Sequence, residues 1–296
     1  MKMLLTGGSG FVGKHIKEFF QQDNSLSILG RNSNADLKYD ITDYIPSFDS
    51  KFNLVVHNAG RVHLVPKTTS ELNSFFKVNH IGTLNLLKAL EESPPDNFIL
   101  ISTVAVYGLA SGININEEYP LAAVDPYGKS KILAEKSVLE WCKKYGVKCT
   151  ILRLPLVVGK NAPGNFRAMV NGIKKGYYFN VNGGKARKSM LLVSDIPPVI
   201  QKAIGIEGAF NLSDGINPSF WEISNVIASC LGKQRSYSMP MVIAQISAKI
   251  GDILGDRFPI NSLKLNKLTE DLTFDNTKAR QAFNWNPTPV LDNIEL

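Results

Sequence analysis

The sequence predicts an α/β fold in which a doubly wound parallel sheet is followed by a smaller C-terminal lobe. Two observations carry this prediction: short apolar runs alternate with amphipathic stretches over the first 155 residues, and a glycine-rich turn joins the first run to the first stretch. The runs predict buried parallel strands at residues 3–5, 26–29, 54–56, 98–101 and 150–152. The stretches predict helices at residues 11–20, 70–92 and 127–145.

Composition fits a globular protein in a reducing compartment. The chain has 296 residues, enough to bury a core without disulfides or metals. Its three cysteines show no metal-ligand spacing, so we expect no metal site and a cytoplasmic location. The first strand begins at once, which leaves no room for a signal peptide. The apolar stretch 239–254 is interrupted by Gln245, Lys249 and Asp252, so it predicts a surface or core-packing helix and no membrane span.

Net charge is +7, but the lysines are scattered and form no basic stripe with interleaved aromatic residues. We therefore expect no nucleic-acid partner. An anionic small molecule accounts for the sign of the charge equally well.

The glycine-rich turn predicts a dinucleotide site. Residues 6–13 read Thr-Gly-Gly-Ser-Gly-Phe-Val-Gly, and they lie between the first strand and the first helix. Glycine at 7, 10 and 13 permits a tight turn and lets the backbone approach a pyrophosphate, and the helix N-terminus supplies N–H groups to that anion. The sheet is therefore expected to be of the Rossmann type, with an NAD(P)-binding domain over 1–158 that gains residues from about 191–212. A substrate-binding lobe is expected over 159–190 and 213–296.

The second strand favours NADP, although NAD is possible. NAD selectivity normally uses an acid after this strand, which here ends in Gly-Arg-Asn. Arg31 can pair with a 2′-phosphate, and Asp40 is better placed to accept from the adenine amino group than to bind the ribose.

Tyr127 and Lys131 stand four residues apart at the start of a predicted helix, hence on one face. An ammonium beneath the phenol is expected to lower the tyrosine pKa, which suits proton transfer to a sugar hydroxyl or carbonyl. About 25 residues earlier a strand ends in two hydroxyls, Ser102 and Thr103. Either can hydrogen-bond the reacting oxygen and share the proton with Tyr127.

Together these motifs resemble the extended short-chain dehydrogenase/reductases, in particular the nucleotide-sugar epimerase/dehydratase branch. The resemblance covers nearly the whole chain and implies that Thr103, Tyr127 and Lys131 are catalytic. It implies that the glycine loop, Phe11 and Val12 contact the cofactor. It implies further cofactor contacts from Ala59 and Gly60, which follow the fourth family strand, from the helix residue Asn79 and from the strand-end residue Pro155. It implies that Asn165 and either Arg187 or Lys188 contact the diphosphate of a nucleotide-sugar substrate.

Three reactions are weighed on this basis. Val104 and Ala105 replace the acid pair that 4,6-dehydratases of the family carry, which argues against dehydration. Arg31 and the loop 159–166 favour a 4-keto-6-deoxy sugar-nucleotide reductase of surface polysaccharide biosynthesis. The alternatives are an NAD-dependent nucleotide-sugar 4-epimerase and a non-catalytic dinucleotide sensor. A homodimer through the helices at 70–92 and 127–145 is possible.

Overall fold

The computed structural model describes residues 1–296 except 23–24, 63–65, 67, 235–236 and 255–260. Its centre is a seven-stranded sheet in the order β11-β7-β5-β4-β1-β2-β3, with every neighbouring pair parallel. The strands are β1 (Lys2–Thr6), β2 (Ser25–Gly30), β3 (Leu37–Lys38), β4 (Leu54–His57), β5 (Asn97–Thr103), β7 (Lys148–Leu154) and β11 (Gly208–Asn211). The predicted doubly wound fold is confirmed, and each of the five predicted strands lies within an observed one.

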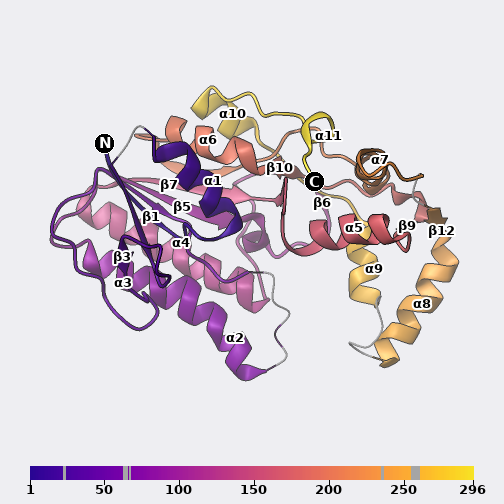
Figure 1. Ribbon diagram of the computed structural model, residues 1–296. Helices are drawn as coiled ribbons and strands as arrows, with labels where there is room; N and C mark the ends of the chain where they lie inside the picture. Colours follow the sequence, from indigo (N-terminus) through magenta and orange to yellow (C-terminus); the bar gives the residue numbers. More distant parts are fainter. Residues whose placement is uncertain (23–24, 63–65, 67, 235–236, 255–260) are drawn as a thin grey trace.

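Helices cover both faces of the sheet (Figure 1). On one face lie α1 (Phe11–Phe20), α6 (Ile196–Lys202) and α10 (Thr277–Phe283), and on the other α3 (Gly82–Ala89) and α4 (Pro126–Tyr145). The alternation of side chains along each strand feeds two separate cores, one containing Leu5 and Ile16 and the other Leu4 and Trp141. Buried apolar area on both faces explains why the strands read as continuous hydrophobic runs.

The strand order reverses between β1 and β4, because the chain fills one side of β1 with β2 and β3 before it crosses to the other. Ligands of such sheets bind outside the carboxyl ends of the strands at this reversal. Thr6, His57 and Thr103 are the last residues of β1, β4 and β5. The fold therefore brings to one edge residues that are almost a hundred positions apart in sequence.

The single helix predicted over 70–92 is wrong in detail. The segment consists of α2 (Thr69–Phe76), a π-helix (Lys77–Ile81) and α3. The sequence analysis continued one α-helical period through this segment, because π-turns are rare and occur mostly as single turns inside α-helices. The π-turn contains Asn79, whose side chain is buried and hydrogen-bonded.

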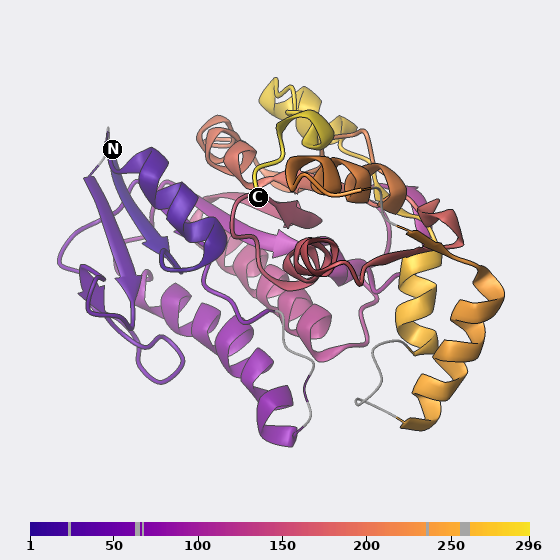
Figure 2. The same cartoon turned by 45° about the vertical axis from the view of Figure 1, so that its right-hand side comes forward.

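In the part of the smaller lobe that the structure describes, three two-stranded parallel pairs lie among helices (Figure 2). The pairs are β8 (Leu156–Val158) with β10 (Met190–Leu192), β9 (Phe179–Val181) with β12 (Tyr237–Met239), and β6 (Gly112–Ile115) with β13 (Leu272–Phe274). The helices are α5 (Gly164–Lys175), α7 (Phe220–Cys230), α8 (Met241–Leu254), α9 (Ser262–Thr269) and α11 (Val290–Asn293). Single turns of 3₁₀-helix lie at Val104–Tyr107, Asn182–Gly184 and Val193–Asp195.

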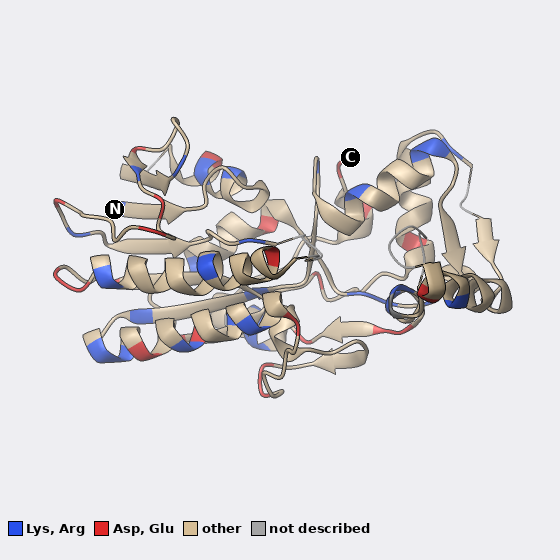
Figure 3. Ribbon diagram, turned by 90° about the horizontal axis from the view of Figure 1, so that it is seen from below, with Lys and Arg blue, Asp and Glu red and all other residues tan. Residues whose placement is uncertain are grey.

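Charged side chains of both signs are spread over the two lobes and do not gather into one stripe (Figure 3). Among the helices that the structure describes, none is both long and apolar enough to cross a bilayer.

Candidate active site

The glycine turn has no room for side chains at two positions. Gly7 adopts φ +70°, and a Cβ there would lie 2.7 Å from the backbone nitrogen of Ala59. A Cβ on Gly13 would lie 2.0 Å from the carbonyl oxygen of Gly7. The Gly10 N–H donates to that same carbonyl at 3.1 Å, which closes the turn. Ser9 and Gly10 in the turn are exposed, so the backbone there is open to close approach by a pyrophosphate.

Helix α1 begins directly after this turn and lacks a side-chain cap. Its N-cap is Gly10, and its first turn, which includes Phe11 and Val12, contains no acidic residue. Uncapped N–H groups and the positive end of the helix dipole favour an anion at this point. The glycine turn at residues 6–13, called the glycine cradle below, and the N-terminus of α1 together fit the pyrophosphate of a nicotinamide dinucleotide.

A buried histidine that the sequence analysis did not select holds this turn to the neighbouring strand. His57 Nδ1 lies 2.7 Å from Thr6 Oγ1, and its Nε2 lies 2.8 Å from Thr83 Oγ1. Burial, and secondly the charge of Lys131, lowers the pKa of His57 to about 3, so the ring is neutral. The Thr6 hydroxyl also accepts from the N–H of Ala59 at 3.0 Å. The sequence feature that could have identified His57 is its position at the end of an apolar strand.

Asn79 joins the cofactor side of the site to the catalytic helix. Its amide donates to Ser130 Oγ of α4 at 2.9 Å and to the Arg61 carbonyl at 3.2 Å, while its Oδ1 accepts from the Arg61 N–H at 2.6 Å. A Cβ on Gly60 would lie 3.3 Å from the same Oδ1. The predicted residues Ala59, Gly60 and Asn79 are thus packed into one hydrogen-bonded unit beside the glycine turn.

Tyr127 is the second residue of α4, and Asp125 fixes where that helix begins. The Asp125 carboxylate accepts from the Gly128 N–H at 2.9 Å, and Pro126 occupies the first helical position. Burial raises the pKa of Tyr127 to about 12, and interaction with the Thr103 side chain opposes the rise. Thr103 at the end of β5 and Tyr127 are therefore neighbours, as the sequence analysis expected.

The Lys131 ammonium is bound to the backbone of β5. Its Nζ donates to the Ile101 carbonyl at 2.8 Å. Burial also lowers the pKa of Lys131 itself to about 8, against the attraction of Glu135. The pKa of Tyr127 is therefore raised and not lowered as the sequence analysis expected, because burial disfavours the charged phenolate.

Ser102 lies in a different environment from Thr103. Successive side chains of a strand point to opposite faces, and the Ser102 hydroxyl donates to the buried carboxylate of Glu135. That carboxylate is paired with Arg153, at 2.8 Å between Oε2 and Nη2. Arg153 in turn donates to the Tyr107 hydroxyl at 2.9 Å, and this hydroxyl donates to Asn211 at 2.8 Å. Of the two candidate hydroxyls, Thr103 is the one next to Tyr127.

Arg31 and Asp40, predicted to contact different parts of the cofactor, contact each other. Arg31 Nη1 lies 3.6 Å from Asp40 Oδ2, and the arginine side chain is 73% exposed. The Asp40 carboxylate also accepts from the Thr42 N–H at 3.0 Å. The guanidinium, which directly follows β2, is thus held only by a solvent-exposed and therefore weak ion pair.

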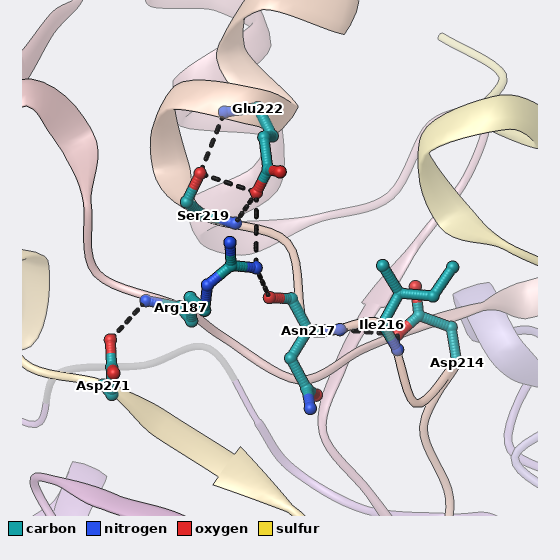
Figure 4. Close-up of polar contacts among 7 residues, drawn as sticks. All are labelled: Arg187, Asp214, Ile216, Asn217, Ser219, Glu222 and Asp271. Carbon is teal, nitrogen blue, oxygen red and sulfur yellow. Dashed lines mark hydrogen bonds and ion pairs between the residues drawn. The ribbon is translucent and has the colours of Figure 1, made fainter.

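The two basic candidates for the diphosphate point in different directions. Arg187 Nη1 lies 3.5 Å from the Glu222 carboxylate and donates to the Asn217 carbonyl at 3.0 Å (Figure 4). It lines a cavity of about 370 Å³ whose other walls are Gly183, Lys185, Ser219, Trp221 and Glu222. Lys188 Nζ instead donates to the Glu270 carbonyl, and burial lowers its pKa to about 8.

The remaining predicted residues are Pro155 and Asn165. Pro155 connects β7 to β8, and Asn165 is exposed in the first turn of α5. Within the described ranges, no group of three or more His, Cys, Asp or Glu side chains could hold a metal ion.

The fold and this site define a class: an NAD(P)-dependent enzyme of the extended short-chain dehydrogenase/reductase type, either a nucleotide-sugar epimerase or a reductase. Residues 3–204 match the model of the NAD dependent epimerase/dehydratase family. The chain belongs to that family.

Two curated relatives are similar over almost their full length. One is the N-acetyl-alpha-D-glucosaminyl-diphospho-ditrans,octacis-undecaprenol 4-epimerase of Escherichia coli O157:H7, 26% identical over 95% of this chain and 89% of the relative. The other is a UDP-glucose 4-epimerase of Vibrio cholerae, 26% identical over 98% of this chain and 92% of the relative.

Solved structures share the fold. RMD from Pseudomonas aeruginosa, complexed with NADPH, superimposes with a TM-score of 0.74 at 22% identity, covering 98% of this chain and 95% of its own. The UDP-glucose 4-epimerase of Thermotoga maritima, with UDP-glucose, gives a TM-score of 0.74 at 20% identity, covering 97% and 94%. Neighbours of this fold hold either NADPH or NAD, so the fold accommodates both dinucleotides.

Proposed function

We propose that the chain is a 4-epimerase of a hexose or N-acetylhexosamine linked through a diphosphate. One observation carries the proposal: Thr103 and Tyr127 lie together at the carboxyl edge of the sheet, beside a glycine cradle that fits a dinucleotide. Tyrosine and hydroxyl at this place suit proton transfer at a sugar oxygen. The two relatives that match over almost their full length are both 4-epimerases, which supports the choice of reaction.

The chain's own residues handle the proton and the position of the sugar. Thr103 would hydrogen-bond the C4 oxygen, and Tyr127 would remove the proton of that oxygen and later return it. A bound nicotinamide dinucleotide supplies the acceptor and donor of hydride at C4. Since the pKa of Tyr127 is about 12, the phenol is protonated at neutral pH. Its action as a base therefore needs a positive charge nearby, and the Lys131 ammonium, on the same face of α4, is the chain's own source.

The reductase reading of the sequence depended on Arg31 as a free partner for a 2′-phosphate. Arg31 is instead exposed and forms only a weak surface pair with Asp40, so it does not decide between the two dinucleotides. Dehydration lacks support as well, since Val104 and Ala105 in the 3₁₀ turn after β5 provide neither acid nor base. An epimerase needs no net oxidant and can therefore retain its dinucleotide. NAD or NADP would serve, and we propose NAD for an enzyme that does not exchange it.

The test is incubation of the purified chain with UDP-glucose or UDP-N-acetylglucosamine and no added dinucleotide, followed by proton NMR of the C4 configuration. The proposal predicts a mixture of both C4 epimers, and a nucleotide released from the protein by denaturation. It is contradicted if neither sugar is epimerised while added NADPH is oxidised stoichiometrically by a 4-keto sugar nucleotide.

A further inference from the structure

Helix α8 presents its large apolar side chains to solvent. Its buried residues are Ala244, Ala248 and Gly251, and the two alanines pack with Val181 and Leu265. Six larger apolar residues are instead 44–86% exposed, namely Val242, Ile243, Ile246, Ile250, Ile253 and Leu254. This is the reverse of the usual arrangement, in which a surface helix turns its large apolar side chains to the core.

These six side chains form one continuous face. At 3.6 residues per turn they fall within an arc of about 120° around the helix axis, with no polar residue inside it. Gln245, Lys249 and Asp252 lie on one side of that arc, and the buried small residues lie on the other. We call the six residues the α8 face. Helix α8 lies at the outer end of the smaller lobe in both views (Figures 1 and 2).

Exposed aromatic and basic residues lie in the same lobe as the α8 face. Strand β12 leads into α8 and pairs with β9, and their exposed Tyr237 and Phe179 rings lie 6.4 Å apart between centroids. Lys249 on α8 itself and Lys185 in the same lobe are exposed. Amphipathic rings and lysine ammonium groups next to an apolar helix face are the features of a helix that lies in the plane of a membrane interface.

We propose that the α8 face docks the protein reversibly on an anionic membrane surface and so presents it with a lipid-linked sugar diphosphate. This rests on the proposed 4-epimerase function, for which one full-length relative is named for an undecaprenyl-diphosphate sugar. The cavity lined by Arg187 and Lys185 lies in the same lobe, because Gly183 in its wall donates to Ser238 of β12. A diphosphate bound there would stand close to the element that leads into α8.

Charge favours a membrane over a second copy of the chain as the occupant. The net charge of +7 attracts anionic lipid headgroups, whereas it opposes the approach of two identical chains. The helix has 14 residues, too few to span a bilayer but enough to lie along its surface.

The experiment is cosedimentation of the full chain with vesicles of phosphatidylcholine containing about one third phosphatidylglycerol, without any sugar. The test variant is Ile246→Ser/Ile250→Ser/Ile253→Ser, which leaves the buried side of α8 unchanged. The matched control is Ile45→Ser/Ile113→Ser/Leu139→Ser, which removes three exposed apolar side chains elsewhere. We expect the wild type and the control to bind, and the α8 variant to bind at least tenfold more weakly at equal thermal stability.

Absence of wild-type binding, or equal binding by the α8 variant, overturns the proposal. So does a wild-type dimer in sedimentation velocity that the α8 variant converts to monomer, without vesicle binding, since the face would then join two copies. Epimerisation of a water-soluble UDP-sugar is measured in parallel. If that activity is present and vesicle binding is absent, only the membrane inference fails; if binding is present and no sugar is epimerised, only the enzymatic proposal fails.

Discussion

At the scale of single residues, burial rather than charge sets the protonation of the site. Tyr127 and Lys131 are both shifted toward their neutral forms, with pKa values of about 12 and about 8. Burial disfavours the charged form of each group. A charged ligand that binds nearby would therefore change both pKa values. The site is thus arranged to respond to its cofactor and substrate.

Replacing Tyr127 by Phe removes the proton carrier and leaves the glycine cradle intact. We expect kcat to fall about 10²- to 10⁴-fold, with dinucleotide affinity nearly unchanged. Steady-state kinetics and a cofactor titration check this. Tyr145→Phe, at the far end of the same helix, is the control and is expected to leave kcat unchanged. Normal turnover by Tyr127→Phe would exclude the assigned role.

Replacing Arg31 by Ala tests cofactor choice. If the guanidinium contacts a 2′-phosphate, the variant should bind NADPH more weakly by about tenfold and NADH almost as before. Fluorescence titration with both dinucleotides measures the two affinities. Lys38→Ala, in the adjacent strand β3, controls for a general loss of positive charge. Equal effects on both dinucleotides would show that Arg31 serves Asp40 alone.

His57 makes stability depend on pH below neutrality. Its pKa is about 3 in the folded chain, below the ordinary 6.5, so the unfolded chain binds its proton first. Stability from this group is therefore complete above pH 6.5 and is lost as the pH falls toward 3, by on the order of 5 kcal/mol in total. Urea unfolding across this range should show the slope in the wild type and a smaller one in His57→Gln. Identical slopes would contradict the assignment.

At the scale of elements, a buried ion pair connects α4 to β7. Glu135 and Arg153 are 1% and 6% exposed, and the Ser102 and Tyr107 hydroxyls complete their hydrogen bonds. Such a pair is costly to break, because the remaining charge is left buried without a partner. The network therefore holds the helix that carries Tyr127 and Lys131 against the sheet.

Glu135→Gln should consequently lower the free energy of unfolding by about 3 kcal/mol. The matched control is Glu140→Gln on the same helix, whose exposed pair with Lys136 at 3.9 Å should contribute less than about 0.5 kcal/mol. Chemical denaturation of both variants measures the difference. Equal losses would mean that Arg153 finds another partner when Glu135 is neutral.

Sequence reasoning identified the elements whose pattern is local. The glycine turn, α1 and the start of α4 are set by neighbours in the chain, and the structure places them within one residue of the prediction. The π-turn at Asn79, the use of Ser102 by Glu135 and the pairing of Arg31 with Asp40 depend on contacts between distant segments. Residue type alone could not indicate these contacts. The sequence showed that the segment forming α8 is apolar. It did not show that the isoleucines of this helix face the solvent.

At the scale of the whole molecule, the two lobes contribute different groups of residues. The parallel sheet brings the ends of β1, β4 and β5 to one edge, and with them the cradle, the neutral histidine and the Thr103–Tyr127 pair. The smaller lobe contributes the cavity beside Arg187 and the exposed α8 face. We propose that the first lobe performs the hydride chemistry and that the second selects what is attached to the sugar.

The most direct test of this account uses a diphosphate-linked sugar with deuterium at C4 and no added dinucleotide. Oxidation and re-reduction at one retained cofactor return the same hydrogen isotope to C4. We therefore predict that the epimerised product, analysed by mass spectrometry and NMR, keeps the deuterium at C4 in ordinary water. An epimerised product that has lost its deuterium to solvent would contradict the account, because the C–H bond would then have been broken by proton removal.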